Sequence, residues 1–249
     1  MNEPYGPGFE PENNTFYATQ GPDGVFNTHA RYETLSEYTA KTFGWMFAGL
    51  MVTFLVALAG YTSGIGILLL RSPILFLGLA IAEIAVVVGM SARIHKIGVS
   101  TARGMFFLYA ALNGAVFSCY FYLYQMFDLV LAFGATALYF GIMAAYGYLT
   151  KQDLSGWAKP LFFGLIAMLI VSVVGIFIGG VNILLCCLGI IIFACYTAYD
   201  TQKIKAAYFA YAGNPELAKK ASVFSALELY LDFINLFLYI LRIFSRSRN

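Results

Sequence analysis

Charge is scarce in this sequence. Asp, Glu, Lys and Arg make up 11% of the 249 residues, whereas a soluble domain carries roughly 25%. Hydrophobic residues make up 60%, and the mean hydropathy is +0.74. This balance excludes an ordinary soluble protein and predicts a chain that crosses a membrane several times. No clustered basic patch is present, so we expect no nucleic-acid partner.

Metal-binding and catalytic patterns are missing as well. Each of the four cysteines lies inside an apolar segment, and their spacing with the two histidines makes no zinc pattern. The chain has no phosphate-binding glycine loop, no H-E-x-x-H and no G-x-S-x-G. We therefore expect neither an enzyme nor a bound cofactor, apart from a calcium ion considered below.

The start of the chain differs from the rest because it is polar and rich in Pro, Gly and Asn. It lacks the basic start and the apolar core of a signal peptide. We interpret residues 1–40 as a disordered polar tail and residues 41–249 as a membrane domain.

Seven apolar segments follow the tail, each near the length of about 20 residues that a membrane-spanning helix needs. They predict an all-α, polytopic membrane protein built as a seven-helix bundle. Two acids in the last segment nearly cancel its favourable insertion energy, so we expect this helix to lie centrally among the others. The predicted segments are Thr42–Tyr61, Pro73–Ala92, Gly104–Tyr124, Leu129–Leu149, Pro160–Ile178, Val181–Tyr199 and Ala226–Phe244.

A polar stripe runs along the last segment. Its members recur at intervals of three or four residues, which places them on one face of an α-helix. Because polar and acidic groups are costly in lipid, this face should point at protein and mark a functional site. The stripe consists of Ser225, Glu228, Asp232, Asn235, Tyr239 and Arg242.

Four acids lie within or at the edge of the predicted spans: Glu83, Asp200, Glu228 and Asp232. No Lys or Arg is expected deep enough to neutralise them. An unpaired buried carboxylate either takes up a proton or binds a cation, and its oxygen atoms suit calcium better than a soft metal. We therefore predict a proton- or cation-responsive site among these acids, with calcium as the favoured metal ion.

Each acid also has a purely structural interpretation, which the sequence leaves open. Asp200, at the predicted end of the sixth span, could be solvated and paired with Lys203. Asp232 could be a protonated carboxyl bonded to a neighbouring helix, and Glu228 an interfacial residue. For Glu83 the alternative is a neutral hydrogen bond to Asn113 or Ser118, and for Asn235 a hydrogen bond between helices.

Basic residues indicate the orientation. Lys and Arg gather in the tail, in the second and fourth connections and in the long connection of about residues 200–225, whereas the other connections hold only Arg71. The positive-inside rule therefore places the N-terminus in the cytoplasm. Arg242, Arg246 and Arg248 would lie outside after seven full spans, and a re-entrant last segment would keep them inside. We favour the full span because the polar stripe runs along the whole segment.

Three stretches resemble the Bax inhibitor-1 family, also called transmembrane BAX inhibitor motif proteins. They are T-K-Q-D-L-S-G-W at 150–157, A-Y-D-T-Q-K-I-K at 198–205 and A-L-E-L-Y-L-D-F-I-N-L-F-L-Y-I-L-R-I-F at 226–244. The short connections favour a bacterial inner-membrane member.

That resemblance implies a pH-sensitive calcium leak. By motif, Asp200 and Asp232 would form its proton-sharing pair and, once deprotonated, could bind the calcium ion. Glu83 would be its intramembrane glutamate and Arg93 its latching arginine, with Arg103 as a second choice. The family also implies an alternative, a non-conducting protein that acts in stress tolerance or cell death or that associates with a membrane protease. A proton-coupled transporter is a third class, but paired broken helices are not seen.

Overall fold

The computed structural model describes residues 19–20, 26–27, 33–92, 96–178, 183–211 and 213–246. Most of this chain is α-helical, and a single 3₁₀ turn, η1 (Ser155–Trp157), is assigned within the described part. The helices are α1 (Leu35–Thr62), α2 (Ile65–Arg71), α3 (Pro73–Ala92), α4 (Val99–Phe117), α5 (Tyr120–Leu123), α6 (Met126–Leu149), α7 (Ala158–Ile178), α8 (Ile183–Ala210) and α9 (Pro215–Arg246).

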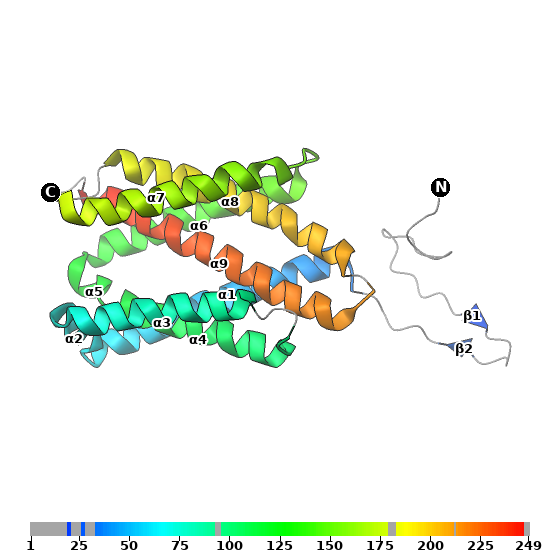
Figure 1. The fold of residues 1–249 in the computed structure, drawn as a ribbon, viewed down its shortest axis with the longest axis horizontal. Helices are drawn as coiled ribbons and strands as arrows, with labels where there is room; N and C mark the ends of the chain where they lie inside the picture. The colour runs from blue at the N-terminus through cyan, green and yellow to red at the C-terminus, as the bar shows by residue number, and fades with distance from the viewer. Residues whose placement is uncertain are drawn as a thin grey trace.

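The last helix lies at the centre of the bundle. Figure 1 shows α9, in orange to red, running obliquely between a group formed by α6, α7 and α8 and a group formed by α1 to α4. It contacts α1, α4, α6 and α8. Its buried residues lie all around its axis, which is typical of a helix enclosed by protein. The predicted central position of the last helix is confirmed.

Each of the seven predicted segments is helical over most of its described residues. Within the described residues, six helical stretches are long and apolar enough to cross a membrane: α1, α3, α4 with α5, α6, α8 and α9. The seventh, α7, has 21 residues and packs along α8, so it reaches the length that a span needs. The short helix α2, which turns the chain between α1 and α3, was not predicted.

Helix α1 begins at Leu35, earlier than the predicted Thr42, because a capping box starts it. The side chain of Thr34 accepts from the backbone N–H of Glu37, and the Glu37 side chain accepts from the Thr34 N–H. Most of the predicted tail, residues 1–40, lies outside the described residues.

The described part of the tail includes two short strands, β1 (Thr19–Gln20) and β2 (Phe26–Asn27), which pair antiparallel.

The connection between the sixth and seventh spans is shorter than the predicted stretch of about residues 200–225. Helix α8 continues to Ala210, and α9 already begins at Pro215. Asp200 therefore lies inside α8 and not at its end. The basic residues of this region extend both helices beyond the apolar segments, since hydropathy marks where a helix meets lipid but not where its backbone hydrogen bonding stops.

Helix α9 is one unbroken helix of 32 residues, about 48 Å long at 1.5 Å per residue. Its last turns lie at the end of the bundle opposite the α8–α9 connection (Figure 1). Within the described residues α9 is thus long enough for the full seventh span that the sequence favoured.

A buried hydroxyl contact fixes α9 against α1 and α4. Tyr230 is fully buried, and its hydroxyl lies 2.6 Å from that of Thr53. The Thr53 hydroxyl is also 2.9 Å from the carbonyl oxygen of Ala110 on α4. Phe106 and Tyr109 of α4 pack edge-on against the Tyr230 ring, each at 5.8 Å between centroids. This contact sets the rotation of α9, so the opposite face with its acids turns toward α8.

Candidate functional site

Two aspartates meet between α8 and α9. Asp200 of α8 is 6% exposed and Asp232 of α9 is 4% exposed, and their side chains are hydrogen-bonded to each other. A carboxylate has no donor, so this bond requires a proton on one of the two carboxyls. Oδ2 of Asp232 is buried and has no hydrogen-bond partner among the described residues. The structure therefore brings the predicted pair together.

A cation next to the pair was missed by the sequence analysis. Because α8 continues past Asp200, Lys203 lies one turn further along it, and its Nζ is 2.5 Å from Oε1 of Glu228 on α9. Both side chains are partly exposed. The expectation that no Lys or Arg reaches the acids is wrong. The solvated Asp200 of the structural interpretation is wrong as well, because Asp200 is buried. Lys203 acts on Asp200 electrostatically but makes its hydrogen bond to Glu228. The three-residue step from Asp200 to Lys203 was the signal for a shared helical face.

Small residues allow the helices around the pair to approach closely. A methyl group added at Gly147 of α6 would lie 2.1 Å from the carbonyl oxygen of Ala198 on α8. One added at Gly189 of α8 would lie 2.7 Å from the ring of Tyr239 on α9. Close backbone approach of this kind is how helices pack in a membrane. It holds α8 between α6 and α9 with Asp200 turned inward.

The C-terminal half of the polar stripe, Asn235, Tyr239 and Arg242, has a structural role. The Tyr239 ring stacks on Phe193 of α8 at 6.0 Å between centroids, and the guanidinium of Arg242 lies 5.6 Å from the Tyr239 ring. The Asn235 amide donates to the carbonyl oxygen of Leu231 in its own helix at 2.8 Å. The prediction that Asn235 forms a hydrogen bond between helices is therefore wrong, because its amide bonds within α9.

Glu83 occupies a separate place. Its Oε1 is buried and has no hydrogen-bond partner in the part of the chain that the structure describes. It lies within electrostatic range of Tyr109, Tyr120 and Tyr230. The expected partners bond elsewhere, because Asn113 donates to the Tyr109 hydroxyl and Ser118 donates to the Ala115 carbonyl. The structure thus brings Glu83 to a cluster of tyrosines between α3, α4 and α9.

The predicted latch, Arg93, lies outside the described residues. The second choice, Arg103, has its guanidinium 4.5 Å from the centre of the Trp45 ring. No hydrogen bond or ion pair links it to Asp200 among the described residues. Those residues also contain no group of three or more His, Cys, Asp or Glu side chains placed to hold a metal ion. A resident calcium ion on Asp200 and Asp232 stays a prediction.

A glutamine anchors the loop before α7 to α8. The N–H of Leu154 donates to the side chain of Gln202, and the Gln202 amide donates to the carbonyl of Gln152, both at 2.7 Å. Within the loop, Asp153 accepts from the backbone N–H and the hydroxyl of Ser155. These two hydrogen bonds hold the pKa of the Asp153 carboxyl below its ordinary value, and the bond from the Ser155 backbone has the larger effect. Two of the motif stretches are thus joined through Gln202.

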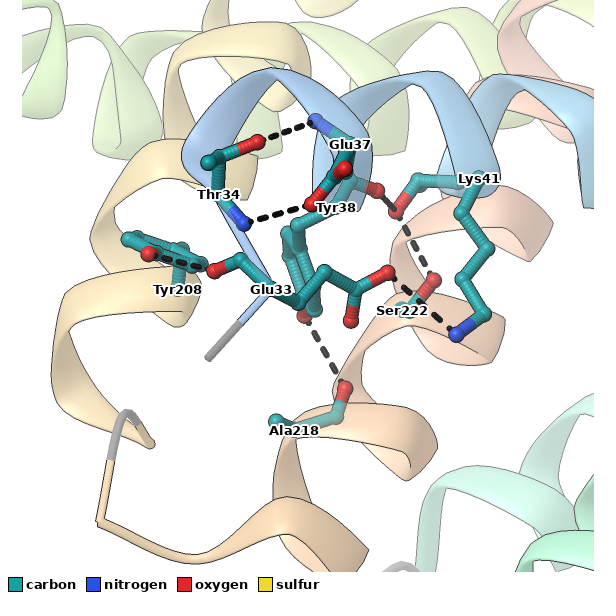
Figure 2. A network of polar contacts seen from close by, with 9 residues as sticks. Glu33, Thr34, Glu37, Tyr38, Lys41, Tyr208, Ala218 and Ser222 are labelled. Atoms are coloured by element: carbon teal, nitrogen blue, oxygen red, sulfur yellow. Dashed lines mark hydrogen bonds and ion pairs between the residues drawn. The ribbon is translucent and has the colours of Figure 1, made fainter. Parts of the chain in front are cut away.

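Hydroxyl groups join three helices at the end where α1 begins. Figure 2 shows the Tyr208 hydroxyl of α8 donating to the Glu33 carbonyl at 2.7 Å and the Tyr38 hydroxyl of α1 donating to the Ala218 carbonyl of α9 at 3.1 Å. The rings of Tyr38 and Tyr208 are 5.5 Å apart. Since α8 and α9 carry the aspartates, these bonds hold both helices against the start of α1.

The chain matches known proteins along the whole helical part. Residues 35–249 match the family model described as inhibitor of apoptosis-promoting Bax1. The chain is 38% identical over 218 residues to the inner membrane protein YbhL of Escherichia coli, covering 86% of this chain and 93% of that protein. The chain belongs to the Bax inhibitor-1 family. An uncharacterized protein of Borreliella burgdorferi is 36% identical over 217 residues, covering 86% of this chain and 94% of that protein. An uncharacterized protein of Deinococcus radiodurans is 35% identical over 210 residues, covering 83% of this chain and 89% of that protein.

This member of the Bax inhibitor-1 family is a multi-pass membrane protein in contact with the lipid bilayer. The name of the Escherichia coli relative places that protein in the inner membrane. Both the family and the seven-helix fold were predicted from the sequence and are confirmed.

Proposed function

We propose that this protein is a pH-sensitive cation leak whose gate is the Asp200–Asp232 pair. The hydrogen bond between these two buried carboxyls, one on α8 and one on α9, is the observation that carries the proposal. It joins two helices through a single proton. In an ordinary bundle, such a contact would be replaced at lower cost by apolar packing, so its presence favours a role in function.

In the closed form the two aspartates share one proton, which pins α9 to α8. Loss of that proton leaves two like charges in a site of low dielectric, where they repel strongly. The titration belongs to the pair as a unit. The charged groups that act on it are Glu228 and Lys203, which lie next to it. The helices then separate, or the two carboxylates accept a cation in place of the proton.

Calcium is the ion that this chemistry favours as the transported species. Carboxylate oxygens are hard ligands, which suit calcium better than a soft metal. Glu228 would offer a further oxygen at the exposed edge of the site once Lys203 releases it. The proposal also places the N-terminus in the cytoplasm of a bacterial cell, on the distribution of basic residues, and the protein in the inner membrane, as with its Escherichia coli relative.

The test is calcium entry into liposomes that contain only this protein, measured between about pH 5 and pH 8, a range that spans physiological titrations. We expect flux to rise with pH, because deprotonation opens the gate. Asp200→Asn and Asp232→Asn should each remove most of this pH dependence. Glu33→Gln is the matched control, since it removes an acid whose surface ion pair with Lys41 is worth little.

Two results would count against the leak. Absence of flux at every pH, from protein shown to be folded by its helical circular dichroism, would favour the non-conducting interaction protein. An unchanged pH profile in both aspartate variants would leave a leak but would remove the pair as its gate.

A further inference from the structure

A polar groove lies at the end of the bundle where α4 and α9 begin. Its volume is about 630 Å³. It is lined by Ser100 and Arg103 of α4, by Asn214 just before α9, and by Glu216 and Lys219 of α9. None of the residues that line the groove belongs to the gate proposed above. Its lining combines two helix starts that are distant in sequence.

Arg103 is held in the groove without an anionic partner. Its guanidinium carbon lies 4.5 Å from the centre of the Trp45 ring of α1, which fixes the side chain from one side. Its Nε is buried and has no hydrogen-bond partner among the described residues. A buried donor left unpaired is costly, so an acceptor is expected at this position.

The second cation in the groove is also uncompensated. The neighbouring acid, Glu216, is engaged by Lys220 at 3.0 Å. Lys219 is exposed and makes no ion pair in the described part of the chain. The groove therefore presents Arg103 and Lys219 with no free acid between them. In addition, the N-cap residue of α4, Gly98, provides no side-chain cap, so the first N–H groups of α4 add positive potential.

We propose that this groove binds the phosphate of an anionic phospholipid from the adjacent leaflet. The groove sits where spanning helices end, and Trp45, packed against Phe107 of α4 at 5.9 Å, is an aromatic residue of the kind that marks the headgroup level. Arginine offers a fork of donors that fits a phosphate, and lysine a point charge. Two uncompensated cations beside an interfacial tryptophan fit a lipid phosphate better than a neutral headgroup.

Native mass spectrometry of the full-length protein in detergent tests this proposal. Phosphatidylglycerol and phosphatidylcholine with the same acyl chains are titrated separately, and inorganic phosphate is added as a third arm. We expect phosphatidylglycerol to bind preferentially. A basic residue near a membrane surface is worth about fivefold in affinity, so the double substitution Arg103→Gln with Lys219→Gln should weaken binding about 25-fold.

The matched control replaces Lys151 and Lys159, two exposed lysines of the α6–α7 connection and the start of α7. The changes Lys151→Gln and Lys159→Gln remove the same charge and should leave the affinity for phosphatidylglycerol within about twofold, because these residues lie outside the groove. If the double groove variant does not fold, Lys219→Gln alone, at an exposed position, should still weaken binding about fivefold.

Three outcomes would overturn the proposal. Equal affinity for the two lipids would remove the preference for an anionic headgroup. An equal loss of affinity in the groove and control variants would indicate a general charge effect. Binding of inorganic phosphate without a preference between the lipids would assign the groove to a soluble phosphate compound.

Discussion

At the scale of single residues, charge is arranged asymmetrically around the α8–α9 contact. Asp200 and Asp232 are almost fully buried and bonded to each other, whereas Glu228 and Lys203 pair at the more exposed edge. Under the proposed function the buried pair holds a proton, because the cation next to it is already engaged. The exposed ion pair contributes little stability by itself. Its position beside the aspartates would let it tune the proposed gate.

Tyr230 gives the residue-scale prediction. Replacing it by Phe removes one buried hydroxyl that is 2.6 Å from Thr53, while the ring contacts stay. We expect a loss of about 0.5–1.5 kcal/mol in the free energy of unfolding, typical of one such bond in a membrane protein. This loss in the free energy of unfolding is measured by unfolding the detergent-solubilised protein in increasing concentrations of SDS.

The control for that prediction is Tyr146→Phe. Tyr146 is exposed, and its hydroxyl is 3.5 Å from the side chain of Gln152, at the limit of a hydrogen bond. Its removal should change stability by less than the Tyr230 change. Equal losses in the two variants would show that the contact between Thr53 and Tyr230 contributes nothing specific.

At the scale of helices, close approach decides which polar groups can meet. Gly147 lets the backbone of α6 touch that of α8 at Ala198, two residues before Asp200. On the other side of α8, Gly189 accommodates the ring of Tyr239. Helices held at larger separation would leave the aspartates too far apart to bond. The glycines of α6 and α8 therefore position the two aspartates without contacting them.

Gly147→Ala is the element-scale prediction. The added methyl group would lie 2.1 Å from the Ala198 carbonyl oxygen, so α6 and α8 must move apart. Overpacking of this kind costs about 1–3 kcal/mol. We expect a lower unfolding temperature and a changed pH profile of cation flux, since the shift reaches Asp200.

Gly141→Ala, on the same helix, is its matched control. A methyl group there would meet no other atom within 4 Å, and alanine favours the helix. This variant should be as stable as the native protein or slightly more so. A stability loss as large as that of Gly147→Ala would assign the effect to α6 itself and not to its contact with α8.

At the scale of the whole molecule, the polar contacts occupy both ends and the centre of one bundle. Tyr38 and Tyr208 join α1, α8 and α9 at one end, and Arg242 lies at the other. The aspartate pair is enclosed between them. The contacts that Figure 2 shows hold α8 and α9 against the start of α1, so the proposed opening at the pair would be a local change.

Seven spans predict that the two ends of the chain lie on opposite sides of the membrane. We expect a fluorescent reporter fused at the N-terminus to be active in the cytoplasm, and alkaline phosphatase fused at the C-terminus to be active outside it. A fusion of the phosphatase after Arg71, in the turn that follows α2, serves as a positive control. Both termini on the same side would contradict the full span of α9.

The sequence by itself determined the number of long helices, the family and the identity of the aspartate pair. Hydropathy and helical period are local properties, so the stripe containing Asp232 was visible without any neighbour. The motif around Asp200 was equally local. For the same reason the sequence predicted that the last helix is central, since the insertion energy of one segment depends only on its own residues.

Only the tertiary structure decided how these groups are partnered. Lys203 meets Glu228 because α8 continues beyond its apolar part and α9 is rotated by the Tyr230 contact. Glu83 lies among tyrosines, and Gln202 holds the loop before α7. Each of these contacts joins residues on different elements, and it depends on which helices are neighbours and how each is turned. That information resides in the packing of the bundle and not in the pattern of any one segment.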